Sequence, residues 1–512
     1  MTRIPKVRIS RICLRRAPVA LAALVALGLG LVAIPSAKAQ TLTVLHSFAG
    51  NGDGIQPMAP LIMDEAGNLY GTTYYGGING RGVVFKVHTS GRETVLYSFP
   101  AYPGDGANPN AGVIMDKAGN LYGTTFYGGE NEILFGGEPE NGTVFKLDTS
   151  GNETLPHSFT GGPGDGSNPY AGLIMDKAGN LYGTTPNGGA FWEGPETPEG
   201  PGAVFKLDTS GSETLLYSFG GPNGVDAGVP LAGVIMDKAG NLYGTTTLGG
   251  DFGEGTVFKL DTSGNATVPY SFPDGAGPIY AGLFMDRAGN LYGTTTHGGA
   301  FGEGTVFKLD PSGKGTVLHS FAGPPGDGAF PWAAPIVDER GNLYGTTYAG
   351  GTGTCNFDGP GCGTVYEIDR YGNETVLHSF AGSPDDGAAP VAGLVTDKAG
   401  NLYGTTEAGG AASWGTVFKL SPPSPQQATQ TIIDAVNALY SQGVLSGAEY
   451  NGLVQRLQKA ILLMNAGRDG DADQSLRAFI REVLGLQRSG VLSPSQAEPL
   501  ISAAEAVIAQ LS

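Results

Sequence analysis

Five aromatic or imidazole side chains are the best candidates for ligand contact in this 512-residue chain. Phe191, Trp192, Trp332, Tyr348 and His297 lie in glycine- and proline-rich stretches between segments of strand-like sequence. Aromatic rings supply a large apolar area, and they stack on sugar faces. We therefore predict that these residues bind a glycan or a peptide. The competing interpretation is that such rings cap the ends of the core, and we expect it to hold for most aromatics next to a Thr-Thr pair.

Four histidines share one position in a repeated segment. They are His46, His157, His319 and His378. Tyr97, Tyr217 and Tyr270 occupy the same position in other copies. A position that accepts either His or Tyr requires a large ring with a polar tip, so packing is favoured over metal binding. We predict no metal site.

The aspartates give no stronger indication of a metal. Asp-Gly recurs between strands as ordinary turn chemistry, and calcium would need several oxygen ligands at one point. Asp469, Asp471 and Asp473 alternate as in a calcium loop, but Gln474 and Ile480 replace the Gly and Glu that an EF-hand requires. The sequence contains no nucleophile elbow, phosphate loop, dinucleotide fingerprint or His-Glu-x-x-His motif. No catalytic residue and no cofactor is predicted.

Cys355 and Cys362 lie in one glycine-rich insertion. A disulfide between them is favoured because they form a pair in a chain whose first 39 residues, described below, have the features of an export signal. A metal site is disfavoured because no histidine or second cysteine pair lies nearby.

The elements that must position these residues are set by a repeat. The phrase Gly-Asn-Leu-Tyr-Gly-Thr-Thr begins at Gly67, Gly119, Gly179, Gly240, Gly289, Gly341 and Gly400. Each copy follows an apolar run that ends in Asp. Each precedes a segment resembling Gly-Thr-Val-Phe-Lys-Leu and another that ends in Ser-Phe. Four short strands per unit, in seven units, predict an all-β, seven-bladed β-propeller over residues 40–420. The repeat tyrosines Tyr122, Tyr182 and Tyr243 are predicted to be buried between blades.

The order of the strands predicts how the ring closes. Leu42 to Phe48 is an outer-type strand that stands alone at the start, while the last unit ends after its third strand at Leu420. We predict that these two strands pair, which removes an exposed sheet edge.

The two faces of the predicted ring carry different connections. Short regular turns, such as Asp116 to Asn120, share one face. The other face carries the links between blades and glycine-rich loops, of which 126–141, 186–201 and 348–362 are long. Function tends to lie on loops held by a rigid scaffold, so we predict ligand binding on this face.

Residues 1–39 have the features of a secretory signal peptide. They hold seven basic and no acidic residues, an apolar run of 16 residues, and a small-x-small sequence that predicts cleavage between Ala39 and Gln40. The run is short for a membrane span, and an uncleaved anchor is the alternative interpretation. No membrane span is expected once the signal is removed. The expected location is secreted, cell-surface or periplasmic. The net charge of −18 disfavours binding to nucleic acid.

The composition changes after the repeats. Residues 421–428 form a Pro-rich linker, and residues 429–512 have apolar residues at helical spacing. Ser446 with Glu449, and Ser493 with Gln496, match capping boxes at helix starts. The segment is duplicated at an offset of 47 residues, which predicts two helical hairpins and thus a four-helix module.

The seven-copy phrase resembles the GloVer repeat of bacterial extracellular proteins, in which varied C-terminal sorting or anchoring segments follow the repeats. The resemblance covers residues 41–420 and implies export and a repeat architecture. The family carries no established activity or catalytic residues. Ala478-Phe479-Ile480 and the two Gly-Val-Leu-Ser turns resemble the FIMAH type of helical module, which implies attachment to a surface or a partner.

These features predict a non-catalytic binding or structural protein whose partner is a glycan, a peptide or a cell-surface component. The alternative is a propeller enzyme, a lyase or a glycoside-acting hydrolase, with its site at the axial mouth. An enzyme would need acids or histidines converging at the axis, and inner-strand sequences such as residues 171–175, Ala-Gly-Leu-Ile-Met, offer little polarity.

Overall fold

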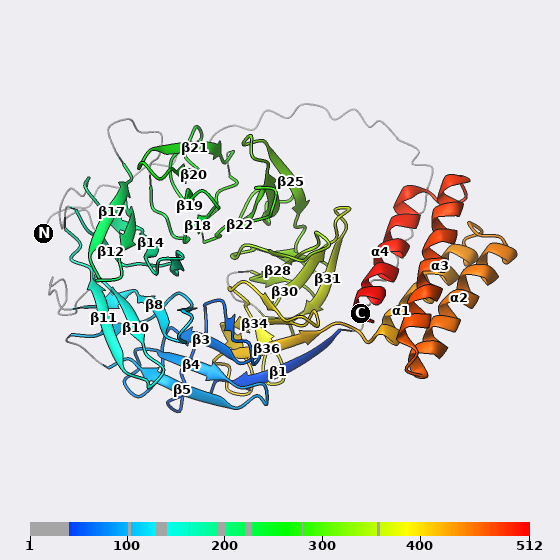
Figure 1. Cartoon of the computed structure of the whole chain (residues 1–512), viewed down its shortest axis with the longest axis horizontal. Helices are drawn as coiled ribbons and strands as arrows, with labels where there is room; N and C mark the ends of the chain where they lie inside the picture. Colours follow the sequence, from blue (N-terminus) through cyan, green and yellow to red (C-terminus); the bar gives the residue numbers. More distant parts are fainter. Residues whose placement is uncertain are drawn as a thin grey trace, which may run out of the picture.

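The chain forms a ring of seven four-stranded antiparallel sheets, or blades, followed by four helices (Figure 1). The computed structural model describes residues 40–100, 104–129, 141–162, 164–191, 201–220, 228–273, 275–278, 280–355 and 359–511. The predicted seven-bladed β-propeller is confirmed. The signal segment and Trp192 lie outside the described residues.

Each blade runs from a two-residue inner strand to a longer outer strand. Blade 1 comprises β2 (Ile62–Met63), β3 (Leu69–Thr73), β4 (Val83–Val87) and β5 (Glu93–Ser98). Blade 2 comprises β7 (Ile114–Met115), β8 (Leu121–Thr125), β10 (Thr143–Leu147) and β11 (Glu153–Ser158). Blade 3 comprises β13 (Ile174–Met175), β14 (Leu181–Thr185), β16 (Ala203–Leu207) and β17 (Glu213–Ser218). Blade 4 comprises β18 (Ile235–Met236), β19 (Leu242–Thr246), β20 (Thr256–Leu260) and β21 (Ala266–Ser271).

The remaining blades follow the same order. Blade 5 comprises β22 (Phe284–Met285), β23 (Leu291–Thr295), β24 (Thr305–Leu309) and β25 (Gly315–Ser320). Blade 6 comprises β27 (Ile336–Val337), β28 (Leu343–Thr347), β30 (Thr364–Ile368) and β31 (Glu374–Ser379). Blade 7 comprises β33 (Val395–Thr396), β34 (Leu402–Thr406), β36 (Thr416–Ser421) and β1 (Thr41–Ser47). Among the described residues, four small two-stranded sheets pair an inter-blade link with the loop of the blade that follows it. They are β6 (Gly106–Ala107) with β9 (Tyr127–Gly128), β12 (Gly166–Ser167) with β15 (Asn187–Gly188), β26 (Gly328–Ala329) with β29 (Ala349–Gly350), and β32 (Gly387–Ala388) with β35 (Ala408–Gly409).

The ring closes within blade 7 as predicted. The N-terminal strand β1 pairs antiparallel with β36, from Thr41 opposite Ser421 to Ser47 opposite Thr416. The first strand of the domain thus fills the outer place that the last repeat leaves open, and no outer edge of β36 remains unpaired.

The first threonine of each Thr-Thr pair fastens its blade to the next. The hydroxyl of Thr72 donates to the carbonyl of Ala111 in the following link, at 2.8 Å, and Thr405 donates to Ala59 at 3.1 Å across the closure. The same bond joins Thr124 to Ala171, Thr184 to Ala232, Thr245 to Ala281, Thr294 to Ala333 and Thr346 to Ala392. The repeated phrase therefore encodes contacts between blades as well as strands.

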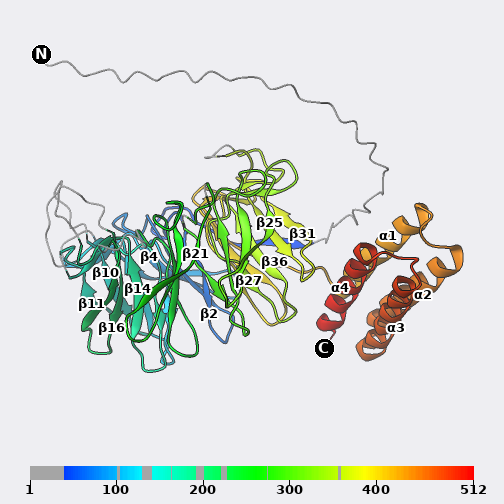
Figure 2. The same ribbon diagram turned by 90° about the horizontal axis from the view of Figure 1, so that it is seen from above.

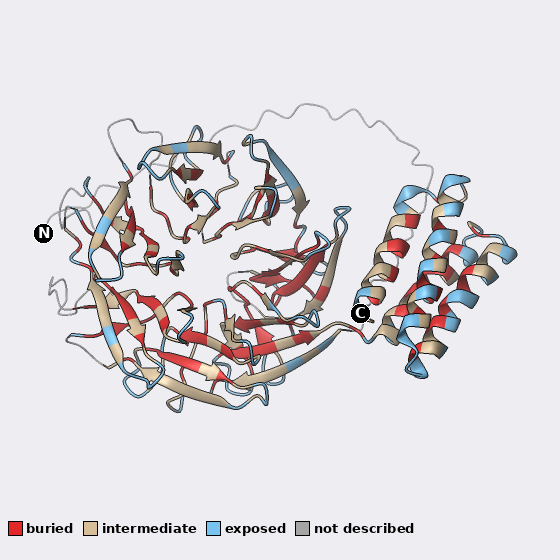
Figure 3. Ribbon diagram, in the orientation of Figure 1, coloured by how far each residue is buried: buried red, intermediate tan, exposed pale blue. Residues whose placement is uncertain are grey.

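The glycine before this pair makes room for an aromatic ring. A Cβ at Gly244 would lie 2.6 Å from Cζ of Phe258. That ring packs edge-to-face on Phe219 of the preceding blade, with 5.1 Å between centroids, and both side chains are buried. Equivalent ring pairs form the core between the other blades. Figure 3 shows the buried residues, in red, along the strands of the blades.

The repeat tyrosines are half-buried, so the prediction that they are buried between blades is wrong in degree. The ring of Tyr182 packs against the apolar cluster of the next blade. Its hydroxyl donates to Asp176 at 3.1 Å, and the Lys206 ammonium lies over its ring. The aspartate that directly follows the inner strand thus holds the hydroxyl of this half-buried ring.

The C-terminal module is a bundle of four helices beside the ring (Figure 2). The helices are α1 (Pro425–Ser441), α2 (Gly447–Asn465), α3 (Asp469–Arg488) and α4 (Pro494–Gln510). The predicted capping boxes at Ser446 and Ser493 are present. A further box at Ser424 starts α1 at Pro425, inside the Pro-rich stretch 421–428.

One apolar cluster fills the centre of the bundle, and Arg370 of the propeller bonds Glu505 of α4 at 2.8 Å. Among the described helices, none combines the length and hydropathy that a membrane crossing requires.

Candidate functional site

One face of the ring carries the inter-blade links and the glycine-rich loops, and we call it the loop face. It bears a row of aromatic side chains in mutual contact. Trp332 and Tyr348 stack in parallel, with 4.5 Å between ring centroids and 2° between ring planes. Tyr280 lies 4.9 Å from Trp332, and Tyr170 stacks on Tyr280 at 5.4 Å. The contact between Tyr170 of blade 3 and Tyr280 of blade 5 passes the intervening blade, so these side chains converge toward the axis.

Tyr170, Tyr280 and Trp332 share one position in the repeat, which we call the link position. The link position is the residue directly before the alanine that accepts the threonine hydrogen bond. Around the ring it is occupied by Met58, Asn110, Tyr170, Leu231, Tyr280, Trp332 and Val391. The alanine is the same in all seven links, whereas the link position differs in size and polarity. The scaffold therefore does not dictate which residue stands there.

Trp332 and Tyr348 differ in their exposure. Tyr348 is buried, with 7% of its surface exposed, whereas Trp332 is half-buried. The Nε1 atom of Trp332 is buried and has no hydrogen-bond partner among the described residues. The structure thus brings two predicted contact residues together, with Tyr348 as the packing partner of Trp332.

A pocket of ≈ 270 Å³ lies beside this stack, where blades 6 and 7 meet the link to blade 1. It is lined by Gln56, Tyr348, Ala389, Glu407, Ala408, Ser413 and Trp414. Trp414 is exposed at 44%, and Nε2 of Gln56 donates to Glu407 at 3.3 Å. The pocket therefore combines aromatic walls with amide, carboxylate and hydroxyl groups.

Burial, followed by the neighbouring Tyr280, raises the pKa of Tyr170 to about 12, with a further contribution from the charge of Glu407. Tyr170 therefore stays a neutral hydroxyl at physiological pH.

His297 and Phe191 lie elsewhere on the loops. His297 is exposed and packs edge-on against Phe330 at 5.2 Å. It lines a second pocket of ≈ 380 Å³ with Leu231, Thr247, Glu254, Gly275, Gly277 and Pro278. Phe191 is 43% exposed, at the edge of the described part of its loop. In the described structure no ring pair joins either residue directly to the Trp332–Tyr348 stack.

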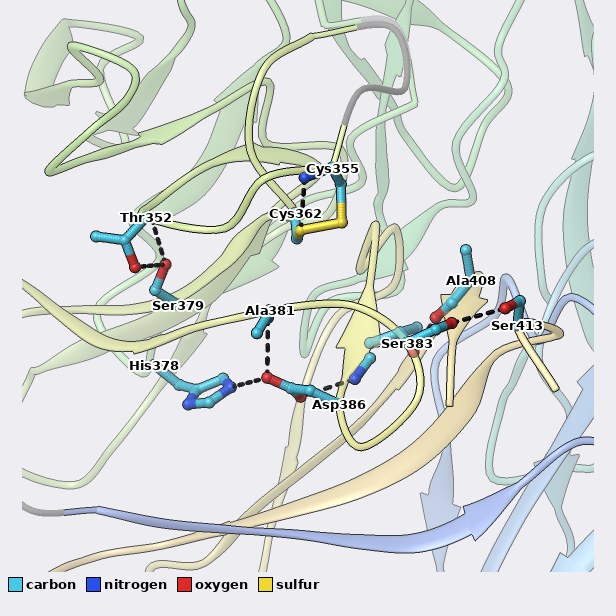
Figure 4. Close-up of a disulfide and its surroundings, with 12 residues drawn as sticks. Thr352, Cys355, Cys362, His378, Ser379, Ala381, Ser383, Asp386, Ala408 and Ser413 are labelled. Atoms are coloured by element: carbon cyan, nitrogen blue, oxygen red, sulfur yellow. Dashed lines mark hydrogen bonds and ion pairs between the residues drawn. A yellow bond between two sulfur atoms is a disulfide. The ribbon is translucent and has the colours of Figure 1, made fainter. Parts of the chain in front are cut away.

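Cys355 and Cys362 form the predicted disulfide in loop 348–362 (Figure 4). Cys362 is fully buried, and the Cys355 N–H donates to its sulfur at 3.1 Å. The bond anchors this loop to the core next to blade 7.

At the repeat position that holds either His or Tyr, the polar end of the ring has a specific hydrogen-bond partner. His378 lies 3.0 Å from the Asp386 carboxylate, which also accepts the Ala381 and Gly387 N–H groups (Figure 4). The aspartate of the Asp-Gly link is thus a turn residue, as the sequence indicated, and the ring is oriented by it.

Four glutamates stand near such aspartates at the blade junctions. They are Glu93, Glu153, Glu213 and Glu374, each at the start of an outer strand. Burial, followed by the charge of the neighbouring aspartate, raises each pKa to about 7. Sequence reasoning missed them, although aligning the outer strands shows Leu42, Ala266 and Gly315 at the same position. His157 with Asp165 and Glu213, and His319 with Asp327 and Glu374, could hold a metal.

The chain matches the model of the Gloeobacter/Verrucomicrobia repeat over residues 28–190, 133–359 and 232–457. No curated protein matches it.

Similar solved structures share little sequence with the chain. A polysaccharide lyase, Uly1, is 11% identical with a TM-score of 0.43, covering 74% of this chain and 92% of its own. A puromycin hydrolase is 14% identical with a TM-score of 0.44, covering 70% of this chain and 50% of its own. A protein from Dyadobacter fermentans is 12% identical with a TM-score of 0.35, covering 74% and 98%.

Proposed function

Since the chain belongs to the Gloeobacter/Verrucomicrobia repeat family, we propose that it is an exported, non-catalytic binding protein. Its propeller binds a glycan or a peptide on the loop face, and its helical module attaches it to a surface or a partner. Residues 1–39 direct export, with cleavage before Gln40. N-terminal sequencing of the exported protein tests this step and is expected to begin at Gln40.

One observation carries the binding proposal, the pocket between Tyr348 and Trp414. Trp414 offers an exposed ring, Trp332 supports the wall from behind Tyr348, and Gln56, Glu407 and Ser413 offer polar groups within the same pocket. Ligand sites combine apolar walls with a few placed polar groups in this way. A sugar presents an apolar ring face together with hydroxyls, so a glycan suits the pocket best.

The test is an array of glycans and peptides probed with the full chain. Trp414→Ala should weaken binding to the best array ligand by about tenfold or more, as the loss of an aromatic contact residue does. The matched control is Phe301→Ala, which removes a 62% exposed ring from the loop of blade 5. Binding that survives Trp414→Ala and Glu407→Gln unchanged would contradict this site.

A second candidate function rests on the pocket that contains His297 and Glu254. An imidazole and a carboxylate in one pocket are residue types used in general acid–base catalysis. No hydrogen bond joins the two side chains in the described structure, and binding without turnover is therefore favoured. Cleavage of the array ligand that is abolished by both His297→Gln and Glu254→Gln would reverse this preference.

A further inference from the structure

At one blade junction, three metal-ligating side chains from separate segments converge. His157 comes from β11 of blade 2, Asp165 from the following link, and Glu213 from β17 of blade 3. The Nε2 atom of His157 lies 3.3 Å from Oδ1 of Asp165, and one ligand atom of each residue lies within 4.8 Å of the others. The same arrangement recurs between blades 5 and 6.

That second set consists of His319 on β25, Asp327 in the link and Glu374 on β31. The Nε2 atom of His319 lies 3.2 Å from Oδ2 of Asp327, and the three ligand atoms again lie within 4.8 Å of one another. Two junctions on different sides of the ring thus present one nitrogen and two carboxylates in equivalent places.

The histidine and the aspartate are held before any ion arrives. The Asp165 carboxylate accepts the N–H and hydroxyl of Thr160 and the N–H of Gly166. The His157 ring packs edge-on against Phe159 at 4.7 Å. Ligands fixed by such outer contacts are a regular feature of metal sites.

The fold does not require a glutamate at this position of the outer strand. Equivalent positions hold Leu42, Ala266 and Gly315, so the strand forms without it. In Glu213 and Glu374 the Oε1 atom is buried and has no hydrogen-bond partner in the described structure. A desolvated carboxylate that faces a second carboxylate is costly unless it is protonated or a positive group balances it, and a bound cation would supply that positive group.

We propose that each of these two junctions binds a divalent transition-metal ion of the Zn²⁺ type through the histidine Nε2 and one carboxylate oxygen each of the aspartate and glutamate. Imidazole nitrogen with carboxylate oxygen is a ligand set used for zinc, whereas calcium takes oxygen ligands alone. The ion would join the outer strand of one blade to the outer strand of the next at the rim of the ring.

The chain contains its own comparisons for this proposal. The junction with His378 and Asp386 (Figure 4) has Leu42 in place of the glutamate. The junction with Tyr97, Asp105 and Glu153 has a phenol in place of the imidazole. His46, Asp53 and Glu93 repeat the residue types, but among the described residues only the two sets above bring their ligand atoms within 4.8 Å of one another.

The experiment uses the full mature chain without an affinity tag, stripped with a chelator and titrated with Zn²⁺ by calorimetry and equilibrium dialysis. Two equivalents are expected to bind. Glu213→Gln and Glu374→Gln should each remove one, and the double variant should bind neither. His378→Gln and Glu153→Gln are matched controls expected to keep both equivalents. Circular dichroism of every variant checks that the fold is retained.

The outcomes separate clearly. Zn²⁺ that raises the melting temperature of the parent chain, but not of the double variant, supports a bridge between blades. Failure to bind Zn²⁺, or binding unchanged in the double variant, would overturn the proposal. Binding of Ca²⁺ in preference to Zn²⁺ would overturn the metal class.

Discussion

The hydroxyl of Thr405 donates to the carbonyl of Ala59 across 346 residues of sequence. This bond is the seventh copy of a contact that each blade makes with its successor. It joins the second strand of the last blade, β34, to the link that leads into the first blade, while β1 and β36 join at the rim. The ring is therefore closed both near its axis and at its periphery.

Deletion of residues 40–48 removes β1 and should open the ring. The edge of β36 would lose its partner, and Phe48, which is fully buried, would leave its place against Phe85. We expect a lower melting temperature and self-association, measured by calorimetry and size-exclusion chromatography. A truncated chain as stable and as monomeric as the parent would contradict the role of β1.

Gly244→Ala should destabilise the propeller by about 1–3 kcal/mol, as overpacking of a core does. The added Cβ would lie 2.6 Å from Phe258, which cannot retreat because Phe219 packs behind it. Urea unfolding measures the change. Gly282→Ala is the matched control, since no atom lies within 4 Å of its Cβ position, and its effect should stay below about 0.5 kcal/mol.

Tyr366→Phe should leave the protein equally stable or more stable. Tyr366 is fully buried, and its hydroxyl has no hydrogen-bond partner in the described structure, whereas the other blades have Phe at this position. Removing an unsatisfied buried hydroxyl removes a desolvation cost of about 1–3 kcal/mol.

The comparison for this variant is Tyr182→Phe, which loses the bond to Asp176 and should cost about 0.5–1.5 kcal/mol. Equal losses of stability in the two variants would mean that the Tyr366 hydroxyl has a partner after all.

Glu153 should make stability fall as pH rises toward neutrality. Burial, followed by the charge of Asp105, raises its pKa from 4.5 to about 7. The folded chain therefore holds this proton between pH 4.5 and 7, where the unfolded chain releases it, and the free energy of unfolding decreases across that window. Glu153→Gln should flatten the slope, measured by urea unfolding with a chelator present. The exposed Glu339→Gln should keep the parent slope.

The blade architecture could be predicted because the same strand sequences recur in each of the seven repeats. Leu42 to Phe48 could be matched to the missing strand after Leu420 without coordinates, since only one place in the ring was vacant. The capping boxes at Ser446 and Ser493 are local in sequence and were equally readable.

The site was predictable only in part. Trp332 and Tyr348 were expected on one face, but their stacking depends on how a link lies against a loop. Glu213 belongs to a different blade from His157, and only the curvature of the ring brings the two side chains together. Sequence spacing carries no information of that kind.

The pairing of Thr41 with Ser421 has a mechanical consequence. The chain enters and leaves the propeller at the same end of one antiparallel strand pair, next to α1. Tension between the N-terminal segment and the helical module would load the β1–β36 ladder one residue pair at a time, as in opening a zipper. Tension applied through the module alone enters β36, which is flanked by β1 and β34. An anchor at the C-terminal end alone therefore does not pull β1 away from β36, whereas restraint at both ends concentrates force on this strand pair.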